Sequence, residues 1–378
     1  MQSRAHQLLG LGQSVWLDFI RRGTLTSGEF DALVRDAGVV GVTSNPTIFQ
    51  QAISKGAEYD GAIAAGVARG LDGEALFEAI AIEDIQTACD RLLGVYERSD
   101  GMDGRVSIEV SPRLAHDGAA TLAAAKRLHA AVGRPGVMIK IPATRAGLPA
   151  FTAATAAGIS VNVTLIFSLA RYREVMDAWL AGLEQRAAAG DDLSVVRSVA
   201  SFFVSRVDTK GDAAIEQRAA ALPAGSPERA ELESLRGKAA VANARLAYAE
   251  FERVTGTPRF ATLRSRGAHV QRPLWASTST KNPAYRDVLY VEELIGPDTV
   301  NTMPPATLAA FNDHGVLEAR IRNDVAGARA LFARLPQLGV PIEALIDQLE
   351  EEGVVAFAKS YDDLLAALDA RVRQLAAR

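Results

Sequence analysis

The feature that most constrains the fold is an alternation of short apolar segments with longer helical patterns along most of the chain. The segments are rich in β-branched and aromatic residues, and the Ala-, Leu-, Glu- and Arg-rich stretches between them repeat apolar residues at i, i+3 and i+4. Eight strands alternating with helices predict a mostly parallel sheet covered by helices, and the count of eight favours an α/β fold closed as a (β/α)8 TIM barrel. An open doubly wound sheet remains the alternative, although no Gly-x-Gly-x-x-Gly motif follows the first strand. The expected strands are 14–19, 39–43, 105–110, 136–142, 159–167, 198–205, 272–277 and 298–303.

Four stretches lie outside this alternation. Residues 50–75 contain small residues and glycines, which indicates short helices and loops. Residues 209–237 are charged and Ala-rich and predict an exposed helical excursion, and residues 281–297 separate strands seven and eight. Amphipathic patterns fill residues 315–378. We therefore predict a barrel over 1–314 with extra helices and insertions at about 209–237 and 281–297, and a C-terminal helical extension over 315–378 that packs on the barrel.

Composition argues against several classes of function. The 378 residues are 48% hydrophobic, which is enough to bury a full core, and a net charge of −4 argues against a general nucleic-acid binder. No apolar run approaches the roughly 20 residues of a membrane span, and the N-terminal segment lacks a cleavage signature. The single cysteine, Cys89, fits a reducing compartment. We therefore expect a cytoplasmic protein that binds neither membranes nor nucleic acid, and the scattered histidines predict no metal site.

Polar residues interrupt or follow the apolar strands at the end where a parallel barrel places its active site. A buried charge without a partner is costly, so one such residue could belong to a paired defect in the core. Several on separate strands are better explained as one group of converging side chains. The residues in question are Asp18, Thr43, Ser44, Asn45, Glu109, Lys140, Asn162, Thr164, Ser201, Arg206, Ser277 and Lys281.

Lys140 is the most informative of them, because it lies in the apolar segment GVMIKIP. Apolar surroundings disfavour an ammonium group, and a neutral amine can attack a carbonyl to give a Schiff base. The structural alternative is a buried ion pair between Lys140 and Glu109 that has no chemical role. Schiff-base chemistry also needs carboxylates: Glu109 could transfer protons during imine formation, and Asp18 could act as the base for bond cleavage. For Asp18 the structural alternative is a cap on the next helix.

Five motifs together resemble the transaldolase family, whose members are lysine Schiff-base barrels of the class I aldolase type. They are GVTSNPTIF (41–49), SIEVSP (107–112), VMIKIPAT (137–144), SVNVTLIFS (160–168) and ASFFVSRVD (200–208), and they occur in order along most of the chain. The STKNPAYRD segment and the helical tail resemble the longer branch of that family.

The resemblance implies a role for each matching residue. Lys140 would form the Schiff base, Glu109 would assist through a water held with Thr164, and Asp18 would deprotonate the C4 hydroxyl of the donor. The remaining matches are substrate-binding residues: Asn45 and Asn162 for the dihydroxyacetone moiety, Ser201 and Phe203 for the pocket wall, and Arg206, Ser277 and a basic residue after strand seven for the phosphate.

That last basic residue is where the chain departs from the pattern of the shorter branch. An arginine is expected two residues after the serine, but Ser279 stands at that spacing. Lys281 follows two residues later and would replace the bidentate arginine with a point charge if the segment carries an insertion. The alternative for Lys281 is a solvated surface side chain. Phe202 also stands where the family often has proline.

The resemblance implies reversible transfer of a dihydroxyacetone unit from sedoheptulose 7-phosphate or fructose 6-phosphate to glyceraldehyde 3-phosphate or erythrose 4-phosphate. It places the chain in the non-oxidative pentose phosphate pathway, with phosphorylated sugars as partners and no cofactor. Two alternatives are an aldolase that releases free dihydroxyacetone from fructose 6-phosphate and a non-catalytic sugar-phosphate-binding barrel. Either a monomer or a homodimer fits the sequence.

Overall fold

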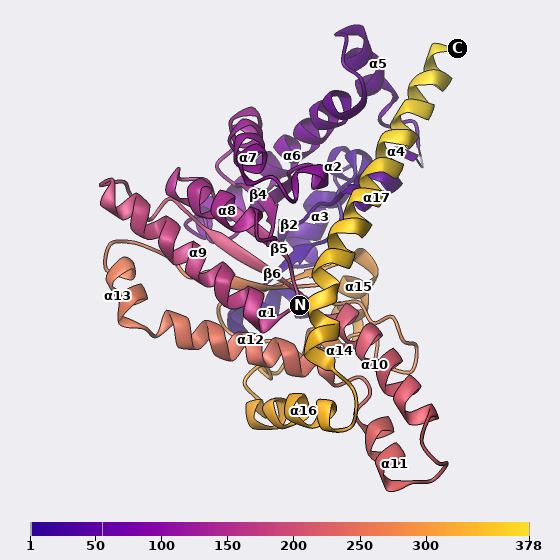
Figure 1. The fold of residues 1–378 in the computed structure, drawn as a ribbon. Helices are drawn as coiled ribbons and strands as arrows, with labels where there is room; N and C mark the ends of the chain where they lie inside the picture. Colours follow the sequence, from indigo (N-terminus) through magenta and orange to yellow (C-terminus); the bar gives the residue numbers. More distant parts are fainter. Residues whose placement is uncertain (1, 55, 378) are drawn as a thin grey trace.

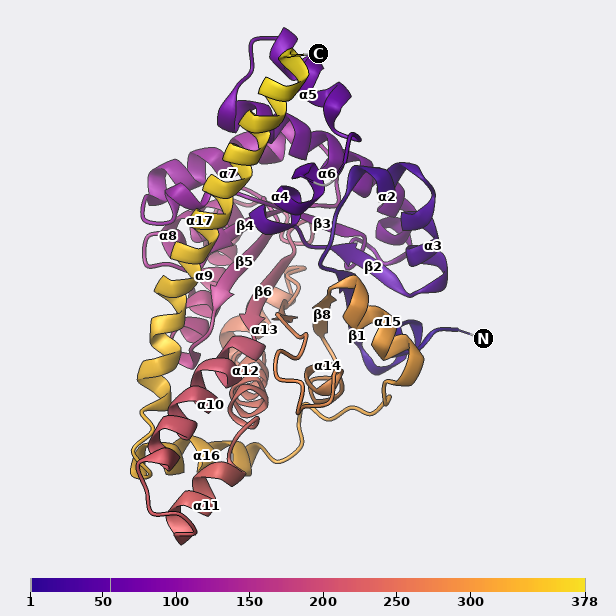
Figure 2. The ribbon, with the colours of Figure 1, turned by 90° about the vertical axis from the view of Figure 1, so that its right-hand side faces the viewer.

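The computed structural model describes residues 2–54 and 56–377, and its centre is a closed parallel barrel (Figures 1 and 2). The strands follow the chain in the order β1-β2-β3-β4-β5-β6-β7-β8, and β8 pairs with β1 to close the barrel. The predicted (β/α)8 barrel is confirmed, and the open sheet is excluded. The strands are β1 Gln13–Leu17, β2 Val39–Val42, β3 Arg105–Glu109, β4 Val137–Pro142, β5 Val161–Ile166, β6 Ser198–Phe203, β7 Gln271–Ala276 and β8 Thr299–Met303.

Helices surround the barrel and form the connections between its strands (Figure 1). They are α1 Arg4–Leu8, α2 Arg22–Thr26, α3 Glu29–Asp36, α4 Pro46–Ser54, α5 Asp60–Ala68, α6 Gly73–Arg98, α7 Gly118–Val132, α8 Gly147–Ala156, α9 Leu169–Ala188, α10 Ser205–Ala220, α11 Pro227–Ser234, α12 Ala239–Thr255, α13 Pro258–Arg264, α14 Leu289–Glu293, α15 Pro305–His314, α16 Val325–Gln337 and α17 Ile342–Ala376, with short 3₁₀ turns η1 Leu9–Leu11 and η2 Pro112–Leu114.

The strand register determines which side chains meet at the carboxyl end of the barrel. Glu109 of β3 pairs with Lys140 of β4, and Lys140 pairs in turn with Asn162 of β5. Alternate residues of a strand point to the same face, so these three neighbouring positions present their side chains side by side. The register alone therefore brings an amine, a carboxylate and an amide together across three adjacent strands.

Strand β6 is shorter than predicted, and helix α10 begins earlier. The sequence predicts a strand to residue 205, but β6 ends at Phe203 and α10 begins at Ser205. The backbone N–H groups of Val204 and Ser205 still donate to the carbonyls of Ala276 and Ser277, at 3.0 and 3.1 Å. These bonds continue the pairing with β7 while the chain turns into the helix, which explains why the strand pattern extends past the strand.

The stretch 209–237 is less exposed than predicted. Its first part belongs to α10, which buries Gly211, Asp212 and Ile215 and packs against α12 and α17. The part that projects from the barrel is the turn after α10 together with α11 (Figure 2). The small, acidic and apolar residues of α10 that face inward are spaced at four, and an Ala-rich sequence conceals that pattern.

The C-terminal stretch contains the longest described helix, α17, which runs from α16 to α5 along the barrel (Figures 1 and 2). It packs against α4, α5, α6 and α10 and against strand β5. Ion pairs link it to distant elements near both ends: Arg171 with Glu350, and Arg371 with Asp60. No helix among the described residues is both long enough and apolar enough to cross a membrane.

Candidate active site

A cavity of about 450 Å³ opens at the carboxyl ends of the strands. The structure brings nine of the eleven predicted site residues to its wall, and the other two, Glu109 and Asn162, join it through hydrogen bonds to Lys140 and Ser201. The nine are Asp18, Asn45, Lys140, Thr164, Ser201, Phe203, Arg206, Ser277 and Lys281. The prediction that these residues converge is therefore confirmed, while their individual roles remain predictions.

Lys140 lies at the base of this cavity with only 5% of its surface exposed. Its Nζ donates to the carbonyl oxygen of Ser44 and to Oε2 of Glu109, each at 3.2 Å. An ammonium group has three donors, and these two contacts orient the side chain and leave one position for a substrate. The amine is thus anchored, and it borders a space large enough for a small sugar.

Glu109 is held beside this amine in a buried position. Burial raises the pKa of its carboxyl group, and the nearby charge of Asp18 acts in the same direction, whereas Lys140 opposes the shift. A carboxyl group whose pKa is raised keeps its proton to higher pH than an ordinary glutamate, which suits a group that donates a proton during imine formation. The contact with Lys140 is the ion pair that would explain both residues without a chemical role. The same contact is also required for proton transfer between Glu109 and the Lys140 nitrogen.

Thr164 supplies a polar atom that no protein group uses. Its Oγ1 is buried on the cavity wall and makes no hydrogen bond with any described residue. A buried hydroxyl is seldom left without a partner, so this atom is suited to bind a water or a substrate hydroxyl. The residue that follows, Leu165, has a φ of 61° where the β5 register shifts. A non-glycine residue in that region is strained, and such strain concentrates at functional sites.

Asp18 comes directly after β1 and faces the same cavity. Its backbone N–H donates to the Met303 carbonyl at 2.8 Å, and its Oδ1 accepts from Thr43 Oγ1 at 2.7 Å. Burial raises the pKa of Asp18, while the Thr43 hydrogen bond and the charges of Lys140 and Lys281 lower it in part. This carboxylate is therefore a stronger base than an exposed aspartate. It does not cap the following helix, since α2 begins only at Arg22.

The two asparagines are already partly engaged. Asn162 is fully buried, and it donates to Ser107 Oγ at 3.0 Å and accepts from Ser201 Oγ at 2.7 Å. Asn45 accepts from the backbone N–H of Ile48 at 3.0 Å, which fixes it at the start of α4. In both cases one side of the amide is held by the protein, so the remaining N–H groups are oriented in advance.

Two cationic side chains, Arg206 and Lys281, also line the cavity. The Arg206 guanidinium lies 5.4 Å from the centroid of the Phe203 ring and forms no hydrogen bond or ion pair with a described residue. Lys281 Nζ donates to Ser279 Oγ at 2.7 Å and is close enough to Asp18 to influence its pKa. Ser277 adopts a φ of 57°, and its Oγ lies 2.9 Å from that of Ser205 at the start of α10. Two cations without a carboxylate bound to them, beside a helix N-terminus, favour an anion.

The structure shows where Lys281 lies, and its role as a phosphate ligand remains a prediction. The side chain is exposed, as the surface alternative requires, yet it also lines the cavity. Both the surface alternative and the replacement of the arginine are compatible with this position, and the second would put an ammonium in place of a guanidinium.

Sequence reasoning missed several contacts of the site. Ser107 holds Asn162, and Thr302 holds Thr43 at 2.7 Å. Ser107 stands two positions before Glu109, so strand alternation could have placed it on the inward face. Phe357 of α17 lines the cavity from more than two hundred residues away from Lys140, and no local signal indicates this.

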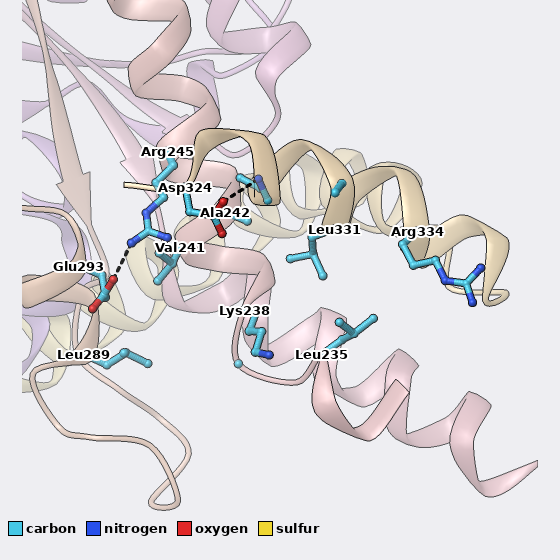
Figure 3. A pocket seen from close by; sticks show the side chains of 14 residues that line it. Leu235, Lys238, Val241, Ala242, Arg245, Leu289, Glu293, Asp324, Leu331 and Arg334 are labelled. Carbon is cyan, nitrogen blue, oxygen red and sulfur yellow. Dashed lines mark hydrogen bonds and ion pairs between the residues drawn. The ribbon is translucent and has the colours of Figure 1, made fainter. Parts of the chain in front are cut away.

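No cluster of three or more histidine, cysteine, aspartate or glutamate side chains suited to a metal occurs in 2–54 and 56–377. A second open cavity, of about 480 Å³, lies between α12 and α16 (Figure 3). It is lined mainly by apolar residues, and its charged groups are largely paired, as in Arg245 with Glu293 at 2.6 Å. None of the predicted site residues lines it, so the chemistry belongs to the cavity at the strand ends.

A lysine held by a carboxylate at the carboxyl end of a (β/α)8 barrel, in one cavity with a second carboxylate and two cations, is the arrangement of a Schiff-base aldolase-type enzyme for phosphorylated carbonyl compounds. Comparison with known proteins agrees. The family model described as Transaldolase/Fructose-6-phosphate aldolase matches residues 15–368, and the chain belongs to that family.

Relatives with the name transaldolase match nearly the whole chain. The Transaldolase of Mycolicibacterium smegmatis is 53% identical over 361 residues, which cover 95% of each chain. Transaldolase 1 of Streptomyces coelicolor is 53% identical over 363 residues, 96% of this chain and 93% of the relative. The Transaldolase of Thermobifida fusca is 51% identical over 378 residues, the full length of both.

Proposed function

We propose that the chain is a transaldolase that transfers a dihydroxyacetone unit reversibly between phosphorylated sugars through a Schiff base on Lys140. The donor is sedoheptulose 7-phosphate or fructose 6-phosphate, and the acceptor is glyceraldehyde 3-phosphate or erythrose 4-phosphate. The observation that carries the proposal is the Lys140 amine, 3.2 Å from Glu109, in a cavity that Arg206 and Lys281 also line. One cavity thus offers an amine for a carbonyl carbon and two cations for a phosphate.

Imine formation is the first step. The neutral amine of Lys140 attacks C2 of the ketose, and the resulting carbinolamine must lose its hydroxyl as water. Glu109 donates the proton that makes water the leaving group, directly or through a water held by Thr164 Oγ1. The raised pKa of Glu109 favours this because the acid form is available at higher pH than for an exposed glutamate.

Bond cleavage is the second step. Asp18 takes the proton of the C4 hydroxyl, the C3–C4 bond breaks, and its electron pair moves into the iminium to give an enamine on Lys140. The departing aldehyde carries the phosphate. The acceptor aldehyde then reacts with the enamine carbon, its oxygen recovers the proton from Asp18, and water hydrolyses the new iminium to release the product. The iminium is the electron sink, so protonated nitrogen and two carboxylates suffice for the cycle.

The remaining residues orient the substrate. Asn45 and Asn162 hold the hydroxyls of the three-carbon unit, and the wall formed by Ser201 and Phe203 excludes solvent from the enamine. Arg206, Lys281 and Ser277 bind the phosphate far from the breaking bond, so that binding energy fixes the geometry of the reacting atoms.

Transfer is favoured over simple release. The full-length relatives are named transaldolases, so the aldolase that frees dihydroxyacetone is not favoured, and neither is a non-catalytic barrel. We propose that the protein acts in the cytoplasm, in the non-oxidative pentose phosphate pathway. Nucleic acid, membranes and cofactors have no part in this scheme. Sedimentation velocity distinguishes the two proposed states of assembly, monomer and homodimer.

Borohydride trapping tests the proposal. The protein is incubated with fructose 6-phosphate, reduced, digested and analysed by mass spectrometry. We expect a reduced three-carbon adduct on the peptide that contains Lys140. The matched control is Lys140→Arg, which keeps a positive charge beside Glu109 but has no nucleophilic amine. A folded wild-type protein that forms no adduct with either donor would return Lys140 to the structural ion pair.

A further inference from the structure

Helix α17 carries three residues, at spacings of four, over the reacting groups of the barrel. Gly353, Phe357 and Tyr361 occupy one face of the helix because positions four apart are neighbours on its surface. The helix reaches this position by running along the barrel from α16 to α5, as Figures 1 and 2 show. The sequence predicted this helix only as part of a packed extension, whereas in the structure its inner face contacts the candidate active site.

Gly353 allows the helix to approach the strand ends closely. A Cβ at this position would lie 3.0 Å from Leu165 Cδ2 and 3.4 Å from Phe167 Cε2. Leu165 is the strained residue that follows Thr164. The helix backbone therefore packs directly on the end of β5, and a larger side chain requires Leu165 or the helix to shift.

Phe357, one turn further on, faces the lysine. Its ring lines the cavity and its centroid lies 5.5 Å from Lys140 Nζ, within the range of a cation–π contact. The side chain is only 8% exposed. The ring therefore covers one side of the amine on which the iminium and the enamine would form.

Tyr361, a further turn on, closes the space behind Glu109. Its ring packs edge-on against Phe77 at 5.7 Å, and both residues border a cavity of about 20 Å³ that Glu109 also lines. That volume is about the size required for one water molecule. The same helix face thus limits water on both sides of the Lys140–Glu109 pair.

We propose that α17, through Phe357, shields the Schiff-base nitrogen and its enamine from bulk water, and so directs the three-carbon unit to the acceptor rather than to release. The inference rests on the proposed Schiff base at Lys140. Phe357 is a positioning and water-excluding residue, and it exchanges no proton or electron with the substrate.

Release of dihydroxyacetone competes with transfer when water, rather than the acceptor aldehyde, reacts with the enamine. If water reaches the enamine, the enamine carbon takes a proton from it and the iminium of dihydroxyacetone results. Hydroxide, or a second water, then adds to that iminium, and hydrolysis returns the Lys140 amine and free dihydroxyacetone. Transfer and release share every step up to the enamine, so their ratio reports only what happens to this intermediate.

The test measures this ratio in variants of the inner and outer faces of α17. Fructose 6-phosphate is supplied with erythrose 4-phosphate, and sedoheptulose 7-phosphate and free dihydroxyacetone are quantified together. We expect Phe357→Ala to raise the ratio of release to transfer about tenfold because water gains access to the enamine, a change equivalent to about 1.4 kcal/mol in the relative barriers. Phe357→Leu should give a smaller rise. The control is Val355→Ala on the outer face, where 59% of the side chain is exposed, and its ratio should remain that of the wild type.

A second variant, Gly353→Ala, allows the inference to be tested even if Phe357→Ala does not fold. Gly353→Ala leaves the cavity side chains intact and puts a methyl group 3.0 Å from Leu165 Cδ2, so that Leu165 or the helix must shift. We expect a rise in the same direction. If the Phe357 and Gly353 variants lose both fluxes in proportion, at the wild-type ratio, the inference is wrong. Failure of the proposed function is a separate outcome, because it would appear as a missing three-carbon adduct in the wild-type protein itself.

Discussion

At the scale of single residues, the two carboxylates of the site differ in what surrounds them, and this separates their roles. Glu109 contacts the amine at 3.2 Å, whereas Asp18 is held by Thr43 and by the strand-end backbone. The groups share one cavity region, and burial raises the pKa of both. Their distinct partners make their functions separable by substitution.

Replacing Asp18 with asparagine should stop the reaction after the imine. We expect kcat to fall by roughly 10²- to 10⁴-fold, the usual contribution of a general base, while imine formation persists. Borohydride should then trap the uncleaved six-carbon donor on Lys140 instead of the three-carbon fragment. Glu109→Gln is the matched comparison and should reduce the yield of every adduct. A three-carbon adduct formed by Asp18→Asn at the wild-type rate would falsify the role of Asp18.

The position of Lys281 predicts a pH effect. Its charge lowers the pKa of Asp18, which burial raises. The base form of Asp18 is required, so activity declines as pH falls through that pKa, and Lys281→Ala should move the acid limb of kcat to higher pH. The profile is measured with saturating substrate, so that weaker phosphate binding does not contribute. Lys359→Ala, on the exposed side of α17, is the control, and an unchanged acid limb in the Lys281 variant would contradict the geometry.

The sequence predicted Lys140, Glu109 and Asn162 from the strands because alternation and the barrel fold leave few choices there, whereas Arg206 and Lys281, outside the strands, were assigned with the help of the resemblance. Lys140 and Glu109 were paired from two separate motifs, and they are in contact. Phe357 could not be found in this way. Helical periodicity predicts that it is buried, but which strand end it covers depends on the path of α17 across the barrel.

At the scale of elements, two tyrosines connect α10 to the segment between β7 and β8. Tyr290 donates to Asp208 at 2.8 Å, and Tyr285 donates to Asp212 at 2.6 Å. Arg206 stands at the start of the same helix, and Lys281 precedes Tyr285 in the same segment. The two irregular stretches of the sequence, 209–237 and 281–297, are thus parts of one support for the cationic side of the cavity.

This support predicts a pH dependence of stability. Burial raises the pKa of Asp208 to about 6. At a pH between the pKa of Asp208 in the unfolded chain and its pKa in the folded chain, the folded chain binds more protons. The free energy of unfolding therefore falls as pH rises through this range. Above pH 6 it stays lower, by about 3 kcal/mol from this group. Asp208→Asn does not titrate, and urea unfolding at a series of pH values should show a flatter slope between about pH 4 and 6. Asp363→Asn, on the surface, should keep the wild-type slope.

At the scale of the whole molecule, the fold was predicted from one repeated pattern. All eight strands are where periodicity placed them, and the closed order follows from the right-handed alternation of strands and helices. The errors lie where helix and strand patterns overlap, as at residues 203–209, or where alanine hides the buried face of a helix, as in α10. The division of the chain into a barrel over 1–314 and an extension over 315–378 stays a prediction.

That division has a thermodynamic test, because the three tryptophans, Trp16, Trp179 and Trp275, all lie outside α17. Their fluorescence reports unfolding of the barrel. Leu364 of α17 is fully buried, and Leu364→Ala should destabilise the protein by about 2–5 kcal/mol through the cavity that it leaves. If the helix and the barrel unfold as one unit, the tryptophan transition in urea moves to lower concentration together with the circular dichroism transition. Val355→Ala on the exposed face should leave both in place. A tryptophan transition that stays at the wild-type midpoint while the helical signal is lost earlier would instead make 315–378 a separate folding unit, and would then remove the rigid support that Phe357 needs over Lys140.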